Sequence, residues 1–176
     1  HKEIRKIENK EGCKIRYIPI LLGGLHNLHG IKAPAFIPAK AKHMIRDCKL
    51  IAERNNIKFK FNSYFPIRSL NLMRGVLVAE EDNIKNYYID SIFNTIWQDG
   101  LNMNDEIVIQ KVLKNLNINP KTFALRSTSS SIKDALRKKT TDAYERGVFG
   151  APTFIANSKI FWGQDRIEFV LKEANK

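Results

Sequence analysis

Near the C-terminus, the segment GVFGAPTF (147–154) has residue types that could bind a peptide-like ligand. It ends a predicted helix and places Pro152 directly before a predicted buried strand. With a cis bond between Ala151 and Pro152, the backbone N–H and C=O of Ala151 would face outward and could pair with an extended peptide. A trans proline that only opens a strand is the ordinary alternative, because few X–Pro bonds are cis.

The segment FWGQDR (161–166) is a second place where chemistry could occur. A hairpin is predicted to end here and a helix to begin, so that backbone N–H groups, the helix dipole and a carboxylate converge. An α-amino acid group could place its ammonium on Asp165 and its carboxylate on donors near Gln164, beside Trp162. The alternative is that Asp165 is only the N-cap of the last helix.

Several other residues have the chemistry of a site but a plainer explanation. His26 and His29 could share a metal, but no third ligand is evident and their apolar surroundings equally suit a loop packed on a sheet. Cys48 falls on an apolar helix stripe, which indicates an inert core thiol, whereas Cys13 has basic neighbours that could lower its pKa. Trp97 is of a type that more often belongs to the core than to a ligand site.

The first forty residues predict a helix, a strand and a loop. Apolar positions one turn apart predict a helix over 1–11, which Gly12 ends as a C-cap. The run KIRYIPILL (14–22) predicts a strand that enters a buried sheet. Gly23 and Gly24 are expected to break it, and residues 25–38 to form a loop long enough to be functional.

The middle of the chain has the apolar period of helices. The predicted helices cover 41–54, the region of 72–77, 84–96 with an end at Gly100, a segment that begins near 107, and one with Pro120 in its first turn.

The C-terminal part returns to mixed structure. The capping-box spacing from Ser131 to Asp134 predicts a helix through Tyr144 that Gly147 ends. A hairpin over 153–156 and 159–162 and a last helix capped by Asp165 with Glu168 follow. The order of elements predicts an α/β layer interrupted by a helical insertion.

Composition limits the classes of function. The 176 residues suit one domain with an insertion, since domains have about 100 to 200 residues. A hydrophobic content of 43% indicates a globular chain despite the net charge of +12, which is spread diffusely, so that we expect no nucleic-acid partner. Charges interrupt every apolar run, which excludes a spanning helix. Two cysteines, too few for a disulfide scaffold, favour a reducing compartment such as the cytoplasm.

The stretch GVFGAPTFIANSKIFWGQDR (147–166) resembles the C-terminal signature of the family of 2-hydroxychromene-2-carboxylate isomerases and kappa-class glutathione transferases. Four other segments agree with that family in order, namely IRYIPILLGGLHNLHG, PAKAKHMIRD, FPIRSLNLMRG and FNTIWQDG. The resemblance implies a thioredoxin-like domain formed by 1–39 and 132–176, with an inserted helical domain over 40–131.

The resemblance also implies glutathione as the cofactor and assigns residues to it. Ala151 and Pro152 match positions that bind the cysteinyl backbone of glutathione, and Gln164 and Asp165 match those that bind its γ-glutamyl end. His26, Ile31 and Trp162 are candidates for substrate binding, although Ile31 stands where many relatives have Asn and the match at His26 is loose.

The family's catalytic Ser lies in a turn just before the helix that begins here at His1, so we identify no catalytic residue in this sequence. The first strand of the sheet would be missing with it. The chain begins at His1 rather than Met, and we expect further residues upstream.

The implied activity is a glutathione-dependent isomerisation by reversible thiolate addition to a conjugated, aromatic carbonyl compound. A small-molecule substrate is therefore expected, no metal and no membrane partner, and a homodimer is one possible assembly. The alternatives are a kappa-like transferase or peroxidase, and a thiol-disulfide oxidoreductase of the same fold, for which no CxxC is present. A noncatalytic basic binding module is the alternative from another class.

Overall fold

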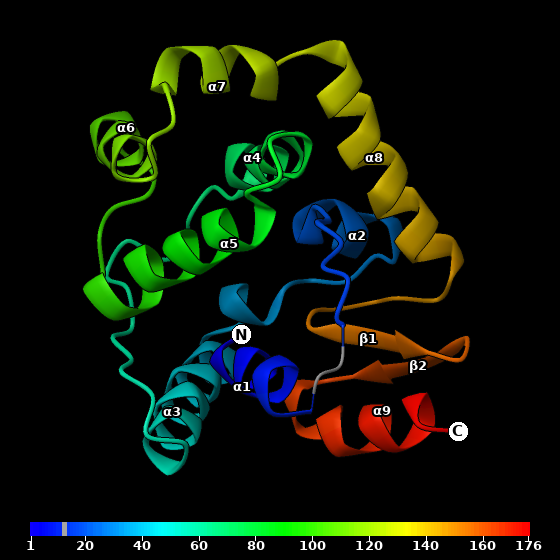
Figure 1. Cartoon of the computed structure of the whole chain (residues 1–176). Coiled ribbons are helices and arrows are strands. Elements are labelled where there is room, and N and C mark those ends of the chain that lie inside the picture. Colours follow the sequence, from blue (N-terminus) through cyan, green and yellow to red (C-terminus); the bar gives the residue numbers. More distant parts are fainter. Residues whose placement is uncertain (12–13) are drawn as a thin grey trace.

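The computed structural model describes residues 1–11 and 14–176, which form helices around one small β-hairpin (Figure 1). The predicted C-cap Gly12 and the thiol of Cys13 lie outside the described residues. The elements in chain order are α1 (Lys2–Glu11), α2 (Leu22–Leu28), the 3₁₀ helix η1 (Pro34–Phe36), α3 (Pro38–Arg54), α4 (Leu70–Glu81), α5 (Lys85–Asn94), the π-helix η2 (Thr95–Asp99), α6 (Glu106–Asn115), α7 (Pro120–Ser127), α8 (Ser130–Glu145), β1 (Thr153–Ala156), β2 (Lys159–Trp162), the 3₁₀ helix η3 (Gln164–Arg166) and α9 (Ile167–Ala174).

The predicted helices of the middle of the chain are confirmed, and local signals explain where they start. Asn119 caps α7 by accepting hydrogen bonds from two backbone N–H groups, and Pro120 occupies the first turn as predicted. The predicted cap of α8 is wrong by two residues. Ser129, not Ser131, has the extended backbone of an N-cap (φ −62°, ψ 154°), and its hydroxyl accepts from the Ile132 N–H at 3.4 Å.

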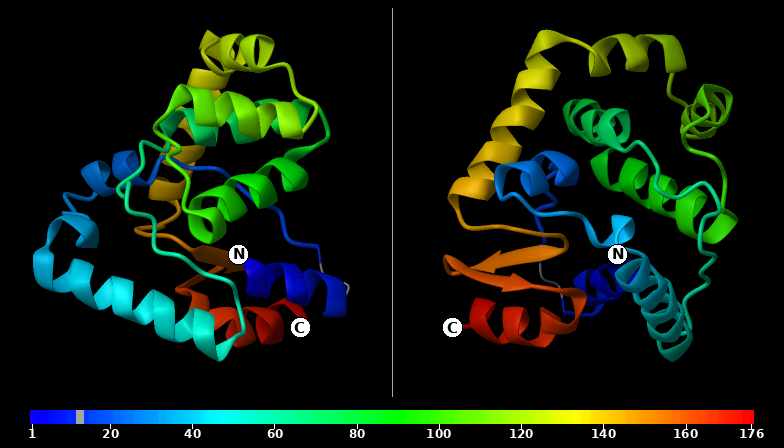
Figure 2. Two further views of the ribbon diagram at one scale, coloured as in Figure 1. Left: turned by 90° about the vertical axis from the view of Figure 1, so that its left-hand side faces the viewer. Right: turned by 180° about the vertical axis from the view of Figure 1, so that it is seen from behind.

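The hydrophobic core lies among the helices rather than on the sheet. Val78 and Ala79 of α4 are fully buried, and α4 packs against α5, α7 and α8. Figure 2 shows these helices gathered on one side of the molecule, with the hairpin and α9 on the other. The buried residues of this cluster are Leu72, Val76, Leu77, Val78, Ala79, Tyr88, Ile89, Ile92, Ile96, Met103, Val112, Leu113, Phe123, Ile132 and Leu136.

The hairpin is confirmed with its predicted bounds. Strands β1 and β2 are antiparallel, with Phe154 opposite Phe161. Asn157 and Ser158 form the turn with positive φ values of 46° and 64°, a conformation that a two-residue hairpin requires. Helix α9 packs on the hairpin.

The predicted strand over 14–22 is wrong, and so is the prediction that this segment enters a buried sheet. Residues 14–21 are not in a strand, and the sheet in the described part of the chain contains only β1 and β2. The N–H of Leu21 instead donates to the Thr140 hydroxyl of α8 at 3.0 Å. A β-favouring sequence becomes a strand only where a neighbouring strand accepts its hydrogen bonds, and none does so here.

The loop predicted over 25–38 is also partly wrong, because α2 begins at Leu22 and runs through both glycines. Leu25 and His26 form its buried face. The packing of that face outweighs the low helix propensity of Gly23 and Gly24, since tertiary burial provides most of a short helix's stability. The division into 1–39 with 132–176 and an insertion over 40–131 stays a prediction.

No helix within the described ranges is both long enough and apolar enough to cross a membrane.

Gly75 permits the close approach of α4 and α5, which gives a first prediction. A Cβ at this position would lie 2.8 Å from Cζ of Tyr88, closer still to its hydroxyl, and 3.0 Å from Cε1 of Phe123. Alanine favours helix over glycine by about 1 kcal/mol, but overpacking costs about 1–3 kcal/mol. Because the added Cβ would overlap the Tyr88 hydroxyl, the cost should lie at the upper end of this range. We therefore expect Gly75→Ala to lower the free energy of unfolding in urea by about 1–2 kcal/mol.

Gly23→Ala is the matched control, because no atom lies within 4 Å of a Cβ built on that helical glycine. It should leave stability unchanged or raise it by up to about 1 kcal/mol. Equal stability of the two variants would contradict the importance of the contact between α4 and α5.

Candidate active site

A pocket of about 420 Å³ lies between the helical part of the chain and the hairpin. Helices α1 and α3, the segment 57–65, the end of α5 with η2, and the starts of β1, η3 and α9 all contribute to its lining. Among its charged side chains, Lys2 and Lys58 are balanced by Glu3 and Asp47. The remaining lining is mostly apolar.

Aromatic rings form one wall of the pocket, which we call the aromatic wall: Phe59, Phe61, Phe65 and Trp97. The ring of Trp97 lies 6.0, 5.9 and 5.8 Å from those of Phe59, Phe61 and Phe65, and the rings of Phe61 and Phe65 are 5.5 Å apart. These separations are typical of packed aromatic side chains. The wall suits a flat apolar group.

The opposite wall comes from the hairpin and the turn after it. Pro152 and Phe154 at the start of β1, and Gln164 and Ile167 after β2, line the pocket. The Ala151–Pro152 bond is cis, as predicted, and Phe65–Pro66 is a second cis bond that we did not predict. The pocket thus brings together Pro152 and Gln164 from the two segments in which the sequence suggested chemistry.

Asp165 is not the N-cap of the last helix, contrary to one of the two sequence interpretations. Gly163 has a φ of 105° and turns the chain into η3, so that Asp165 already lies inside a helical turn. Its carboxylate pairs with Arg166 at 2.7 Å, and its side chain is 59% exposed. Helix α9 starts at Ile167 without a side-chain cap. The carboxylate is therefore accessible beside Gln164 at the edge of the pocket.

The other predicted site residues lie elsewhere. His26 is buried in α2, Ile31 is at the surface, and the exposed Trp162 packs on Phe149 with ring centres 5.1 Å apart. None of these lines the pocket, and Ala151 is exposed next to Pro152. The assignment of His26, Ile31 and Trp162 to substrate binding stays a prediction.

The paired histidines have a structural explanation. His29 Nε2 donates to the Val148 carbonyl at 2.9 Å, and its ring packs on Tyr144 with centres 4.5 Å apart. Among the described residues, no three or more His, Cys, Asp or Glu side chains lie close enough together to hold a metal ion.

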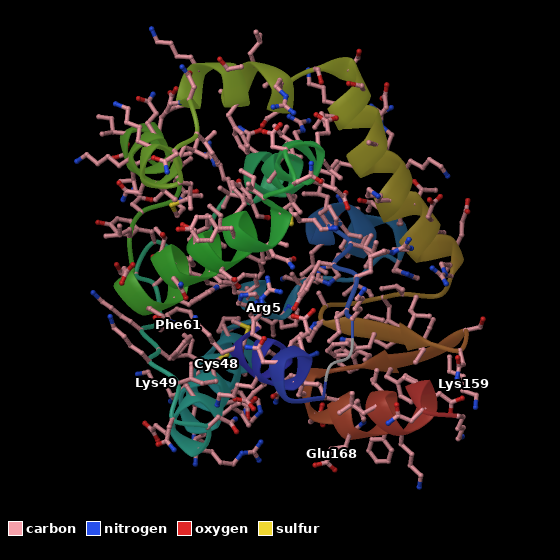
Figure 3. All side chains as sticks on the ribbon, viewed as in Figure 1. Arg5, Cys48, Lys49, Phe61, Lys159 and Glu168 are labelled. Atoms are coloured by element: carbon pink, nitrogen blue, oxygen red, sulfur yellow. The ribbon has the colours of Figure 1, made fainter. Side chains whose placement is uncertain are left out.

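Most of the pocket lining is not predicted by the sequence. Cys48 and Trp97, which the sequence assigns to the core, both line the pocket. Figure 3 shows Cys48 on α3 and Phe61 on the segment that follows this helix. The phenylalanines at 59, 61 and 65 were the available signal, but their convergence on Trp97 is a tertiary contact that no local pattern reveals.

The hairpin with α9 packed on it, next to the block of helices α4 to α8, has the arrangement of a thioredoxin-like protein with a helical insertion. A comparison with known protein families agrees with this class. Residues 1–174 match the DsbA-like thioredoxin domain, and the chain belongs to this family.

Similar proteins include two bacterial isomerases and one animal transferase. The 2-hydroxychromene-2-carboxylate isomerase of Sphingobium xenophagum is 25% identical over 166 residues, covering 93% of this chain and 84% of the relative. The isomerase of the same name from Pseudomonas putida is 25% identical over 176 residues, with 99% and 85% covered. Glutathione S-transferase kappa 1 of Caenorhabditis elegans is 24% identical over 181 residues, with 94% and 80% covered.

A solved structure confirms the fold. The structure of a selenomethionine 2-hydroxychromene-2-carboxylate isomerase matches with a TM-score of 0.87 and 23% identity, covering 99% of this chain and 85% of that chain. The relatives carry the names of enzymes and match nearly the whole chain, which supports an enzyme.

The thiol of Cys48 gives a second prediction. Burial raises the pKa of the Cys48 thiol above its ordinary value, and the negative charge of Asp47 raises it further by a smaller amount. Less thiolate is then present at pH 8, so that iodoacetamide should alkylate Cys48 more slowly than it alkylates a free cysteine. Asp47→Asn should speed the reaction but leave it slower than that of a free cysteine, because the substitution removes only the smaller cause and burial remains.

Mass spectrometry of the Cys48 peptide separates this thiol from Cys13. Asp134→Asn on α8 removes an exposed carboxylate that pairs with Arg137 and does not line the pocket, so it should leave the rate unchanged. Fast alkylation of Cys48 in the parent protein would contradict the raised pKa.

Proposed function

We propose that this chain is a glutathione-dependent isomerase of the 2-hydroxychromene-2-carboxylate isomerase type. The observation that carries the proposal is the pocket, which has Pro152 and Gln164 on one wall and the aromatic wall on the other. The names of the relatives support the same chemistry, since two are isomerases and one is a glutathione transferase.

The residues at the hairpin end of the pocket fit a short peptide with a free amino end. In the proposed arrangement, the backbone N–H and C=O of Ala151 bind the cysteinyl part of glutathione, and the ring of Pro152 contacts the same part. The accessible carboxylate of Asp165 accepts hydrogen bonds from the γ-glutamyl ammonium, and Gln164 contacts the carboxylate of the same group. Hydrogen bonds to charged groups contribute about 1.5–3 kcal/mol, enough for Asp165 to matter to affinity.

Glutathione, when bound, would supply a thiol able to add reversibly to a conjugated carbonyl compound. The thiol of Cys48, which lines the pocket, is poorly suited to that role, because burial raises its pKa and so disfavours the thiolate. The aromatic wall would hold the aromatic part of the substrate and keep water away from it. We assign no catalytic residue, since the matching Ser of the family would precede the first helix.

Two other activities are supported by the same comparisons. The transferase relative favours conjugation of an electrophile, and the match to a DsbA-like thioredoxin domain is compatible with thiol-disulfide exchange. The two cysteines of the sequence, Cys13 and Cys48, do not form a CxxC pair. Incubation with glutathione and an aromatic α,β-unsaturated ketone separates isomerase from transferase, because an isomerase regenerates glutathione and a transferase accumulates the conjugate.

The third prediction tests glutathione binding at the turn after the hairpin. Asp165→Asn removes the charge that would pair with the ligand ammonium, and should weaken glutathione binding in a calorimetric titration by about tenfold to a hundredfold. Stability should change little, because the pair between Asp165 and Arg166 is exposed and such surface pairs contribute about 0–1 kcal/mol.

Asp134→Asn again serves as the matched control, because Asp134 also forms an exposed pair with an arginine, at 3.0 Å. It should leave glutathione affinity unchanged. Equal affinities of the parent and Asp165→Asn would remove Asp165 from the site, and failure of the parent to bind would refute glutathione dependence.

A further inference from the structure

A buried amide lies directly behind the aromatic wall. Asn62 is 0% exposed, and its side chain uses both of its ends. Nδ2 donates to the carbonyls of Ile96 at 3.0 Å and Leu101 at 2.9 Å, and Oδ1 accepts from the Tyr64 N–H at 2.8 Å. A buried polar side chain is stable only when it is paired in this way.

These hydrogen bonds join the segment 57–66 to η2 and the residues that follow it, two segments that do not pair with each other as strands or pack as regular helices. Residues 57–66 run without helix or strand, and η2 is a π-helix whose irregular backbone ends at Gly100, with a φ of 69°. The Lys60 N–H adds a bond to the Trp97 carbonyl at 2.7 Å. The segment 57–66 is therefore fixed to both ends of η2, on either side of Trp97.

The positions of the aromatic rings follow from this joint. Phe61 precedes Asn62 and Phe65 follows three residues later, and Phe65 N–H donates to the Asn62 carbonyl at 3.1 Å. Both rings line the pocket and face Trp97, whereas Asn62 itself does not line it. If the joint shifts, the phenylalanines move relative to Trp97 and the wall changes shape.

We propose that Asn62 is a positioning residue for substrate binding: it holds Phe61 and Phe65 against Trp97, so that the aromatic wall accepts a flat, uncharged aromatic group. The inference rests on the proposed function insofar as that aromatic group belongs to the substrate to which the thiol of glutathione would add. Asn62 acts through the wall and not by contact with the ligand. Its loss should therefore reduce the affinity for aromatic ligands and leave the turn at Gln164 and Asp165 intact.

A merely structural role makes a different forecast. Removal of this buried amide takes a partner from two carbonyls and from the Tyr64 N–H, and lowers stability in either case. If Asn62 had only a structural role, its removal would not reduce the affinity for aromatic ligands more than the affinity for glutathione. The affinities for an aromatic ligand and for glutathione, measured separately, distinguish the two roles.

The fourth prediction uses 2-acetylnaphthalene, a neutral aromatic ketone, and glutathione as separate probes in calorimetric titrations. Asn62→Ala should weaken binding of the ketone by about twofold to tenfold, the range for a displaced aromatic contact, and change glutathione affinity by less than about twofold. Asn119→Ala, which removes the cap of α7 remote from the pocket lining, is the control for lowered stability and should change neither affinity.

Each outcome decides the proposal. No ketone binding by the parent, equal ketone affinities of parent and variant, or parallel losses for both ligands would overturn it. Ketone binding without glutathione binding would refute the proposed function and leave the role of Asn62 to be judged by the ketone alone.

If Asn62→Ala does not fold, Gly100→Ala tests the same contact between the segment 57–66 and η2 at another position. A Cβ there meets only the flexible Lys60 side chain, at 2.9 Å, but the φ of 69° disfavours alanine. The same selective loss of ketone affinity is expected, and unchanged affinity would count against the proposal.

Discussion

The packing of α4 against its neighbours is the contact on which the rest of the structure depends. Gly75 lets α4 approach Tyr88 of α5, and the other sides of α4 meet α7 and α8. Both walls of the pocket are attached to this core. Helix α5 continues into η2 with Trp97, and α8 leads through Gly150 to Pro152 and β1. Helices α4 and α8 thus help to position the pocket although neither of them lines it.

Local periodicity was sufficient to predict most helices and the hairpin, because these elements satisfy their own backbone hydrogen bonds. The helices of the middle of the chain and the strands 153–156 and 159–162 are confirmed. The region 14–28 could not be predicted in the same way. Whether KIRYIPILL pairs as a strand depends on a neighbour, and whether Gly23 and Gly24 join a helix depends on what Leu25 packs against.

The candidate site shows the same division. Pro152 and Gln164 lie in short segments with a specific residue order that singles them out, and both line the pocket, whereas their binding to glutathione stays a prediction. The aromatic wall depends on a contact between the segment around residue 61 and the segment around residue 97, which are distant in the sequence. The buried amide of Asn62 stabilises this contact. An asparagine among phenylalanines has no distinctive local pattern. Its importance becomes visible only when the carbonyls of Ile96 and Leu101 are in place.

The distribution of charge separates the surface from the pocket. The net charge of +12 belongs to the chain as a whole, whereas the charged side chains of the pocket lining include both signs, Lys2 and Lys58 with Glu3 and Asp47. An apolar wall without excess charge binds a flat ligand through burial rather than through ion pairing. Isomerisation and conjugation both need such a wall and a thiolate beside it. The difference between these reactions then depends on whether the substrate releases the thiolate again, which is a property of the substrate's own chemistry as much as of the protein.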